Sequence, residues 1–176
     1  MDPVLTWIAT LLTSLLFVSA GWHKLSAPDY YRVLIRKYIA VPESLAVAAQ
    51  IFLGLVEVAA GLFILLPALR QAAAWVAMTL LIFYFLLIAL SLLRGLNMDC
   101  GCSGPLNKQR LNPWLLFRNA VLAAVAFLLT QPVSDRMLEF SDYMVIGIAS
   151  LVAMLTYVSF EQLLTNEEKL LLLRRR

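Results

Sequence analysis

The only two cysteines of the chain stand one residue apart, in the stretch N-M-D-C-G-C-S-G-P at residues 97–105. Paired thiols in a polar loop, unlike single cysteines buried in apolar surroundings, can bind a soft metal ion or exchange disulfide bonds. A disulfide across one residue is tight, and Gly101 best accommodates the backbone angles it needs. Such a bond is easily reduced. Cys100 and Cys102 are therefore candidate catalytic residues, and together with His23 they are the alternative metal ligands.

Two charged residues lie inside long apolar stretches. Glu57 stands about 20 Å along a helix from Ser44, which places its carboxylate deep in a bilayer. Ionisable groups there are costly and point to a function with a specific partner. Arg118 is the expected partner, with Asn119 beside it as a second hydrogen-bonding group. A structural Glu57–Arg118 clamp and a role in proton relay both stay open.

Three further residues suit the same chemistry. His23 is the only histidine, and it can serve as a general acid or base, or simply sit at the membrane interface. Lys24, and Arg118 if its side chain extends to the membrane surface, are expected to stabilise a thiolate. Tyr38 is the candidate cofactor contact, for a quinone or a substrate, and its alternative is an interfacial belt on an amphipathic segment.

The composition indicates which scaffold must position these residues. The chain of 176 residues is 62% hydrophobic and 14% charged, against about 25% charged residues in globular proteins. Five stretches approach the length of about 20 apolar residues that crosses a bilayer: Val4–Gly21, Ser44–Ala68, Ala72–Leu93, Pro113–Thr130 and Tyr143–Phe160. The sequence predicts an all-α membrane protein, a compact bundle of four to five transmembrane helices forming one domain over residues 1–176.

The basic residues predict the orientation of this bundle. All but two of the 14 lysines and arginines fall on one side of it, and Lys and Arg accumulate in cytoplasmic loops. The N-terminus is then outside, and the C-terminus and the cysteine loop are cytoplasmic, in a bacterial-type inner (cell) membrane. The first span, which starts Met1-Asp2-Pro3 without a basic region, is expected to stay uncleaved. The net charge of +3 reflects topology and does not suggest nucleic-acid binding.

The second span carries a small and polar stripe. Gln50, Gly54, Glu57 and Gly61 recur at helical spacing, so they share one face. That face should contact protein rather than lipid. The glycines alone are explained by close helix packing.

Several short motifs, taken in order, resemble the MauE branch of the DoxX-like membrane proteins. They are Gly21-Trp22-His23-Lys24-Leu25, Tyr38, Pro42, Glu57 with Gly61, Arg94-Gly95, Cys100-Gly101-Cys102-Ser103-Gly104 and Arg118-Asn119. MauE-like proteins are associated with methylamine dehydrogenase maturation, in which a thioredoxin-like partner and many disulfides take part. The resemblance therefore implies membrane-bound thiol–disulfide exchange. It does not imply that this chain serves methylamine dehydrogenase.

These observations predict an integral membrane thiol–disulfide oxidoreductase or redox accessory protein. One cysteine attacks a substrate disulfide and the other resolves the mixed disulfide. A helper of exported proteins would most simply face outward, whereas the charge bias places the pair inside, so a thioredoxin-like protein or a small thiol is the expected partner. Passing electrons across the bilayer would then need a quinone, a small-thiol carrier or movement of the loop. A soft-metal (copper- or mercury-type) binding or transport protein and a non-catalytic assembly partner of a thioredoxin-like protein are the alternatives.

Overall fold

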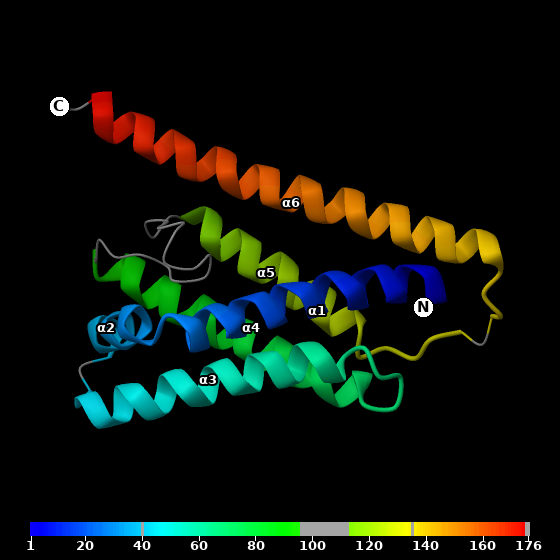
Figure 1. The fold of residues 1–176 in the computed structure, drawn as a ribbon, viewed down its shortest axis with the longest axis horizontal. Helices are drawn as coiled ribbons and strands as arrows, with labels where there is room; N and C mark the ends of the chain where they lie inside the picture. Colours follow the sequence, from blue (N-terminus) through cyan, green and yellow to red (C-terminus); the bar gives the residue numbers. More distant parts are fainter. Residues whose placement is uncertain (40, 96–112, 135, 175–176) are drawn as a thin grey trace.

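The computed structural model describes residues 1–39, 41–95, 113–134 and 136–174, and every regular element within these ranges is a helix (Figure 1). The helices are α1 (Pro3–Ser26), α2 (Pro28–Tyr38), α3 (Glu43–Phe63), α4 (Arg70–Leu93), α5 (Pro113–Leu128) and α6 (Phe140–Arg174). Helices α1, α3, α4 and α6 are long and apolar enough to cross a membrane, and α5 is a shorter apolar helix. The expectation of an all-α membrane protein with four to five spanning helices is confirmed.

Prolines determine two of the helix ends. Helix α5 begins at Pro113, as its sequence predicts, because a proline at the first helical position lacks only an N–H that would have no partner there. Helix α3 ends at Phe63, before the expected Ala68. Pro67 is the reason, since a proline cannot donate to the helical ladder and disfavours the α conformation of the residue before it.

The apolar stretches did not predict the full length of α6 or the presence of α2. Helix α6 has 35 residues and continues past the expected end at Phe160 to Arg174. Helix α2 has 11 residues and lies between the first two spanning helices in sequence. It buries Tyr31 and Leu34 and exposes its opposite face, which is the amphipathic pattern expected around Tyr38.

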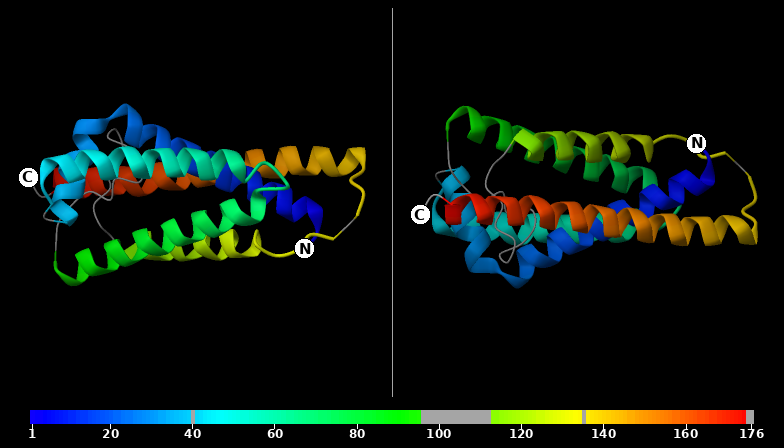
Figure 2. Two further views of the ribbon diagram at one scale, coloured as in Figure 1. Left: turned by 90° about the horizontal axis from the view of Figure 1, so that it is seen from below. Right: turned by 90° about the horizontal axis from the view of Figure 1, so that it is seen from above.

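The helices form a bundle in which α1 has the central position. Helix α1 packs most extensively on α3 and also against α6, while α4 packs on α5. Figure 2 shows α4 and α5 running together on one side, with α1 crossing obliquely between the other helices. The N-terminus and the end of α6 lie at opposite ends of the bundle (Figure 1). Helix α2 lies at the end where α1 finishes, and in the last turn of α1 Lys24 is buried.

The stripe of α3 makes the contact with α1. Gln50 and Glu57 are buried, and the two glycines of the stripe are buried with them. A Cβ added at Gly21 of α1 would lie 2.6 Å from the carbonyl oxygen of Gly54, and one at Gly61 would lie 2.8 Å from Val18 Cγ2. The absence of side chains therefore lets the two backbones approach closely, and the expected packing role of the glycines is confirmed.

Gly21→Ala is expected to lower the free energy of unfolding by about 1–3 kcal/mol, the usual cost of overpacking. Its methyl group would meet the Gly54 oxygen at 2.6 Å and the Val58 nitrogen at 2.9 Å, and these backbone atoms cannot turn away. Gly147→Ala in α6 is the matched control, because nothing lies within 4 Å of its added Cβ. Denaturation in detergent compares the two. Equal stability of both variants would contradict the close contact.

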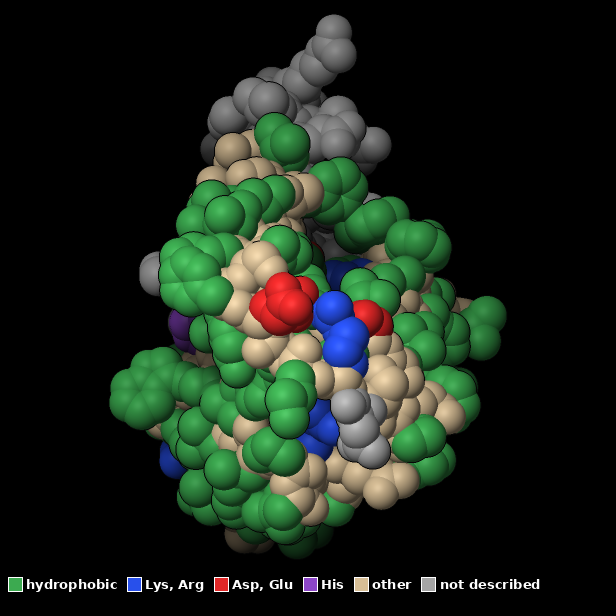
Figure 3. All heavy atoms as spheres, turned by 90° about the vertical axis from the view of Figure 1, so that its right-hand side faces the viewer, with side chains coloured by type: hydrophobic (Ala, Val, Ile, Leu, Met, Phe, Trp, Pro, Cys, Tyr) green, Lys and Arg blue, Asp and Glu red, His purple; other side chains and the backbone are tan. Residues whose placement is uncertain are grey.

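The start of α1 is held against the segment between α5 and α6. Ser134 donates hydrogen bonds to the Met1 carbonyl oxygen from its backbone N at 2.9 Å and from its Oγ at 3.0 Å. Arg136 lies 3.9 Å from Asp2 and 3.1 Å from Asp142. Figure 3 faces this end of the molecule and shows acidic and basic side chains gathered among hydrophobic ones. Water screens exposed ion pairs so that they add little to stability, and these contacts mainly orient the two helix starts.

Candidate functional site

The cysteine pair falls in the connection between α4 and α5, at residues 96–112, which lie outside the described residues. Cys100 and Cys102 are therefore placed by sequence alone, and so is the alternative metal set that joins them to His23. Helix α4 ends and α5 begins at the end of the bundle that carries α2 (Figure 1). In the part of the chain that the structure describes, no group of three or more His, Cys, Asp or Glu side chains could hold a metal ion.

Glu57 is the centre of a buried polar network. The residue is 1% exposed, and Lys24 Nζ donates to both of its carboxylate oxygens at 2.8 Å. Tyr84 of α4 donates from its hydroxyl to Oε1 at 2.5 Å. Three helices thus supply one residue each. Two groups that carry protons therefore meet one buried carboxylate.

The local sequence explains why Lys24 is tolerated there. Gln50, one stripe position before Gly54, donates from Nε2 to the Lys24 carbonyl oxygen at 2.6 Å and so fixes the last turn of α1. The ammonium lies 5.6 Å from the ring centroid of Tyr31 and 5.2 Å from that of Tyr84. Aromatic faces attract cations, most strongly where water is excluded. Together with the carboxylate they offset part of the cost of burying the charge.

A second buried ion pair joins α5 to α6. Arg118 Nη1 lies 2.7 Å from Glu161 Oε1, and both side chains are buried. Asn119 is also buried and donates from Nδ2 to the Leu115 carbonyl oxygen at 3.0 Å, within its own helix. Glu161, one residue beyond the expected end of the last span at Phe160, thus contributes a buried carboxylate.

The predicted direct pairing of Glu57 with Arg118 is wrong. The close packing of α1 on α3 brings Lys24 to Glu57, and α6 brings Glu161 to Arg118. Glu161 was missed because the apolar stretch ends at Phe160, one residue earlier. Lys24 and Arg118 together give two positive charges near the spans against the single negative charge of Glu57, and this imbalance was the signal that could have found Glu161.

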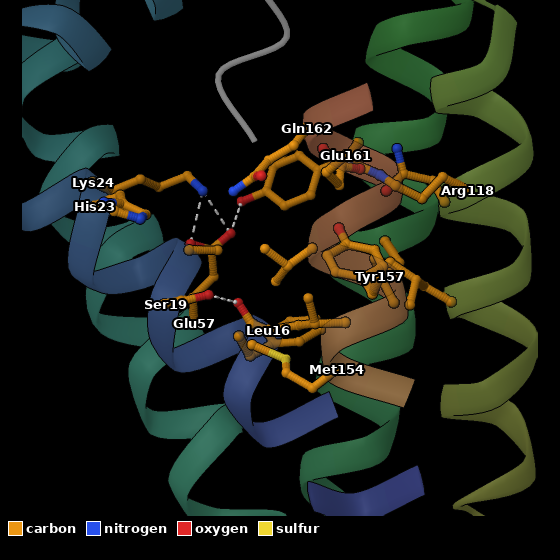
Figure 4. Close-up of a pocket in the computed structure, with 17 residues that line it drawn as sticks. Leu16, Ser19, His23, Lys24, Glu57, Arg118, Met154, Tyr157, Glu161 and Gln162 are labelled. Carbon is orange, nitrogen blue, oxygen red and sulfur yellow. Dashed lines mark hydrogen bonds and ion pairs between the residues drawn. The ribbon is translucent and has the colours of Figure 1, made fainter. Parts of the chain in front are cut away.

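A cavity of about 230 Å³ separates the two ion pairs, and we call it the central cavity. Its walls include all five of the described residues that the sequence nominated as catalytic: His23, Lys24, Glu57, Arg118 and Asn119. Figure 4 shows Lys24 and Glu57 on one wall and Arg118 with Glu161 on the other. Tyr84, Tyr157 and Gln162 also line the central cavity and were not predicted. Residues from five helices therefore converge on one space.

A second cavity, of about 270 Å³, lies beside the first between α2, α3 and α4. It is lined mostly by apolar side chains, and we call it the apolar cavity. Tyr38, the sequence's candidate cofactor contact, lines this cavity and not the central one. Lys24 and Tyr84 line both cavities, so the Glu57 network stands between them.

Known proteins resemble this chain over most of its length. A family model described as "Methylamine utilisation protein MauE" matches residues 1–131. The protein named "Methylamine utilization protein MauE" from Paracoccus denitrificans is 30% identical over 127 residues, which cover 72% of this chain and 68% of the relative. The protein of the same name from Paracoccus versutus is 32% identical over 126 residues, covering 71% and 68%. No solved structure matches the chain.

Proposed function

The chain belongs to the MauE family, and from this premise we propose that it is a multi-pass membrane thiol–disulfide oxidoreductase, or redox accessory protein, that works through Cys100 and Cys102. The observation that carries the proposal is the convergence of Lys24, Glu57 and Tyr84 on an internal cavity, in a chain whose only two cysteines stand one residue apart. The relatives' name links them to methylamine utilization. For this chain we propose thiol–disulfide exchange and do not assign the protein on which it acts.

The exchange itself needs both cysteines. The thiolate of one attacks a substrate disulfide, forms a mixed disulfide and releases one substrate sulfur as a thiolate. The thiolate of the other then attacks the sulfur of the first, releases the second substrate thiolate and leaves a Cys100–Cys102 disulfide. In the opposite direction, a substrate dithiol reduces this bond. Each attacking thiol must lose a proton, and each departing thiolate takes one up.

The Glu57 network is suited to holding such protons. Glu57 accepts from an ammonium and from a phenol at the same time, so a proton can move among three groups without an isolated charge remaining. His23 lies on the wall of the same cavity and offers a further exchange site. Arg118 joins α5 to α6, and α5 begins directly after the cysteine connection, while Asn119 bonds within α5. Because Glu57 and Glu161 neutralise Lys24 and Arg118, neither cation is well suited to stabilising a thiolate, and the proton-holding role belongs to Glu57, Lys24 and Tyr84.

The orientation follows from the basic residues. The proposal keeps the N-terminus outside and the C-terminus and the cysteine connection in the cytoplasm, in a bacterial-type inner membrane, because nearly all lysines and arginines belong to one side. The partner is then a cytoplasmic thioredoxin-like protein or a small thiol, and a quinone or a small-thiol carrier completes the electron path.

The test is the redox state of the two cysteines in membranes. Thiol trapping with a mass-shifting alkylating reagent is expected to show a mixture of free and bridged Cys100 and Cys102. The bridged fraction should rise with an added quinone and fall with reduced thioredoxin. A variant with both cysteines changed to serine shows the background. Cysteines that stay fully reduced under every condition would rule out the redox function.

A further inference from the structure

The apolar cavity has an entrance that faces the bilayer. Phe52 of α3, Phe83 of α4 and Ile39 at the end of α2 line it and are exposed on the outside of the bundle, Phe52 by 66%. Deeper lining residues, among them Tyr31 and Ile88, are buried. Exposed phenylalanines on membrane-spanning helices contact lipid chains rather than water. A ligand of this cavity therefore enters from the hydrocarbon and must dissolve in it.

The inner wall of the apolar cavity holds a hydrogen-bond donor. Lys24 lines the cavity, and its ammonium has three N–H bonds. Among the described residues, the two oxygens of Glu57 are its hydrogen-bond acceptors. One N–H is then available to a ligand. Because Glu57 already neutralises the positive charge, a neutral acceptor fits this position better than a carboxylate such as that of a fatty acid.

The size and the aromatic lining restrict the ligand further. At about 270 Å³, the cavity lies just below the range of about 300–1,000 Å³ that is usual for small-molecule sites. It accommodates a single substituted ring, while a longer tail would remain among the lipids. The rings of Tyr31, Tyr38 and Tyr84 line it, and planar rings stack favourably against aromatic side chains.

We propose that the apolar cavity binds the ring of a membrane quinone, with the Lys24 ammonium donating a hydrogen bond to one of its carbonyl oxygens. The ligand's role as electron acceptor rests on the proposed function, whereas its binding does not. Forming a disulfide from two thiols releases two electrons and two protons, and a quinone takes up both to become a quinol. The two proton-bearing groups that bond to Glu57 are the Lys24 ammonium and the Tyr84 hydroxyl, and both residues line the apolar cavity that would hold the quinone ring.

The binding test uses the purified full chain in detergent and decylubiquinone as the probe, measured by equilibrium dialysis. Ala49→Trp fills the cavity and is expected to weaken binding about tenfold or more. Ala48→Trp is the matched control, because the neighbouring Ala48 is exposed and does not line the cavity. Equal affinity of the two variants would overturn the site. Displacement of the probe by an equal concentration of oleate would identify an acyl-chain groove instead.

The donor is tested with Lys24→Met combined with Glu57→Gln, which removes both charges and leaves neither stranded. We expect about a tenfold loss of decylubiquinone affinity, as for a hydrogen bond to a charged group. Unchanged affinity would exclude Lys24 as the donor. The variant with Cys100→Ser and Cys102→Ser should bind the probe like the wild type. If decylubiquinone binds but does not oxidise the thiols, the quinone site is supported and the redox function is wrong. If decylubiquinone oxidises the thiols and Ala49→Trp does not slow this oxidation, the redox function is supported and the quinone site is wrong.

Discussion

Lys24→Met is expected to lower the free energy of unfolding by about 3–5 kcal/mol, the range found when one partner of a buried ion pair is removed. The reason is the environment of Glu57, which is 1% exposed and receives two of its three hydrogen bonds from Lys24. Without the ammonium, Tyr84 alone faces a buried carboxylate. Unfolding of the variant in detergent, compared with the wild type, measures the loss.

A double-mutant cycle separates the pair from its surroundings. Adding Glu57→Gln to Lys24→Met should recover part of the stability, because the second substitution removes the stranded charge. The same cycle between Glu57→Gln and Arg118→Met should give a much smaller coupling, since Arg118 bonds to Glu161. A larger coupling for Glu57 with Arg118 than with Lys24 would contradict the observed pairing.

Changing one cysteine of the pair to serine is expected to trap a covalent adduct in one variant only. If Cys100 and Cys102 form an exchange pair, one attacks and the other resolves. Loss of the resolving thiol leaves a mixed disulfide with the partner or a small thiol, visible by intact mass or on a non-reducing gel. Loss of the attacking thiol leaves none. The effect is all or none, and it identifies the attacking residue.

The same variants distinguish the other functions. Soft-metal binding predicts that either serine weakens metal affinity comparably, because both thiolates are ligands. A purely structural partner predicts that the variant lacking both cysteines still supports function. Should neither single variant trap an adduct while both lose a bound metal, the exchange mechanism is wrong and the metal function replaces it.

The sequence predicted those features of the fold that follow from local pattern. Apolar length gives the spanning helices, and the helical spacing of Gln50, Gly54 and Glu57 predicts a face that contacts protein. The structure confirms the all-helical membrane fold and the burial of that face. The same reasoning placed the end of α3 too late, since it weighed apolar length above the effect of Pro67.

The partners of Glu57 and Arg118 were harder to predict from the sequence, because they depend on which helices become neighbours. Nothing in the spacing of Glu57 and Arg118 shows that Lys24, at the end of another helix, lies closer to Glu57. Tyr84 was missed for a related reason: a tyrosine within an apolar stretch resembles a packing residue until its hydroxyl is seen to reach a carboxylate. The residues nominated by chemical type nevertheless gather at one cavity, with Tyr38 at the next.

Because α5 and α6 differ in length, they cannot both match the thickness of one bilayer without adjustment. At 1.5 Å per residue, α5 is about 24 Å long and α6 about 52 Å, whereas the hydrocarbon core of a bilayer is about 30 Å thick. A long helix adapts by tilting or protruding, while a short one makes the surrounding lipid thin, at fractions of a kcal/mol per Å. Arg118 and Glu161 connect the two helices, so the tension of this mismatch acts on their ion pair. We therefore expect longer lipid chains to strain the contact between α5 and α6, because α5 is shorter than the hydrocarbon core.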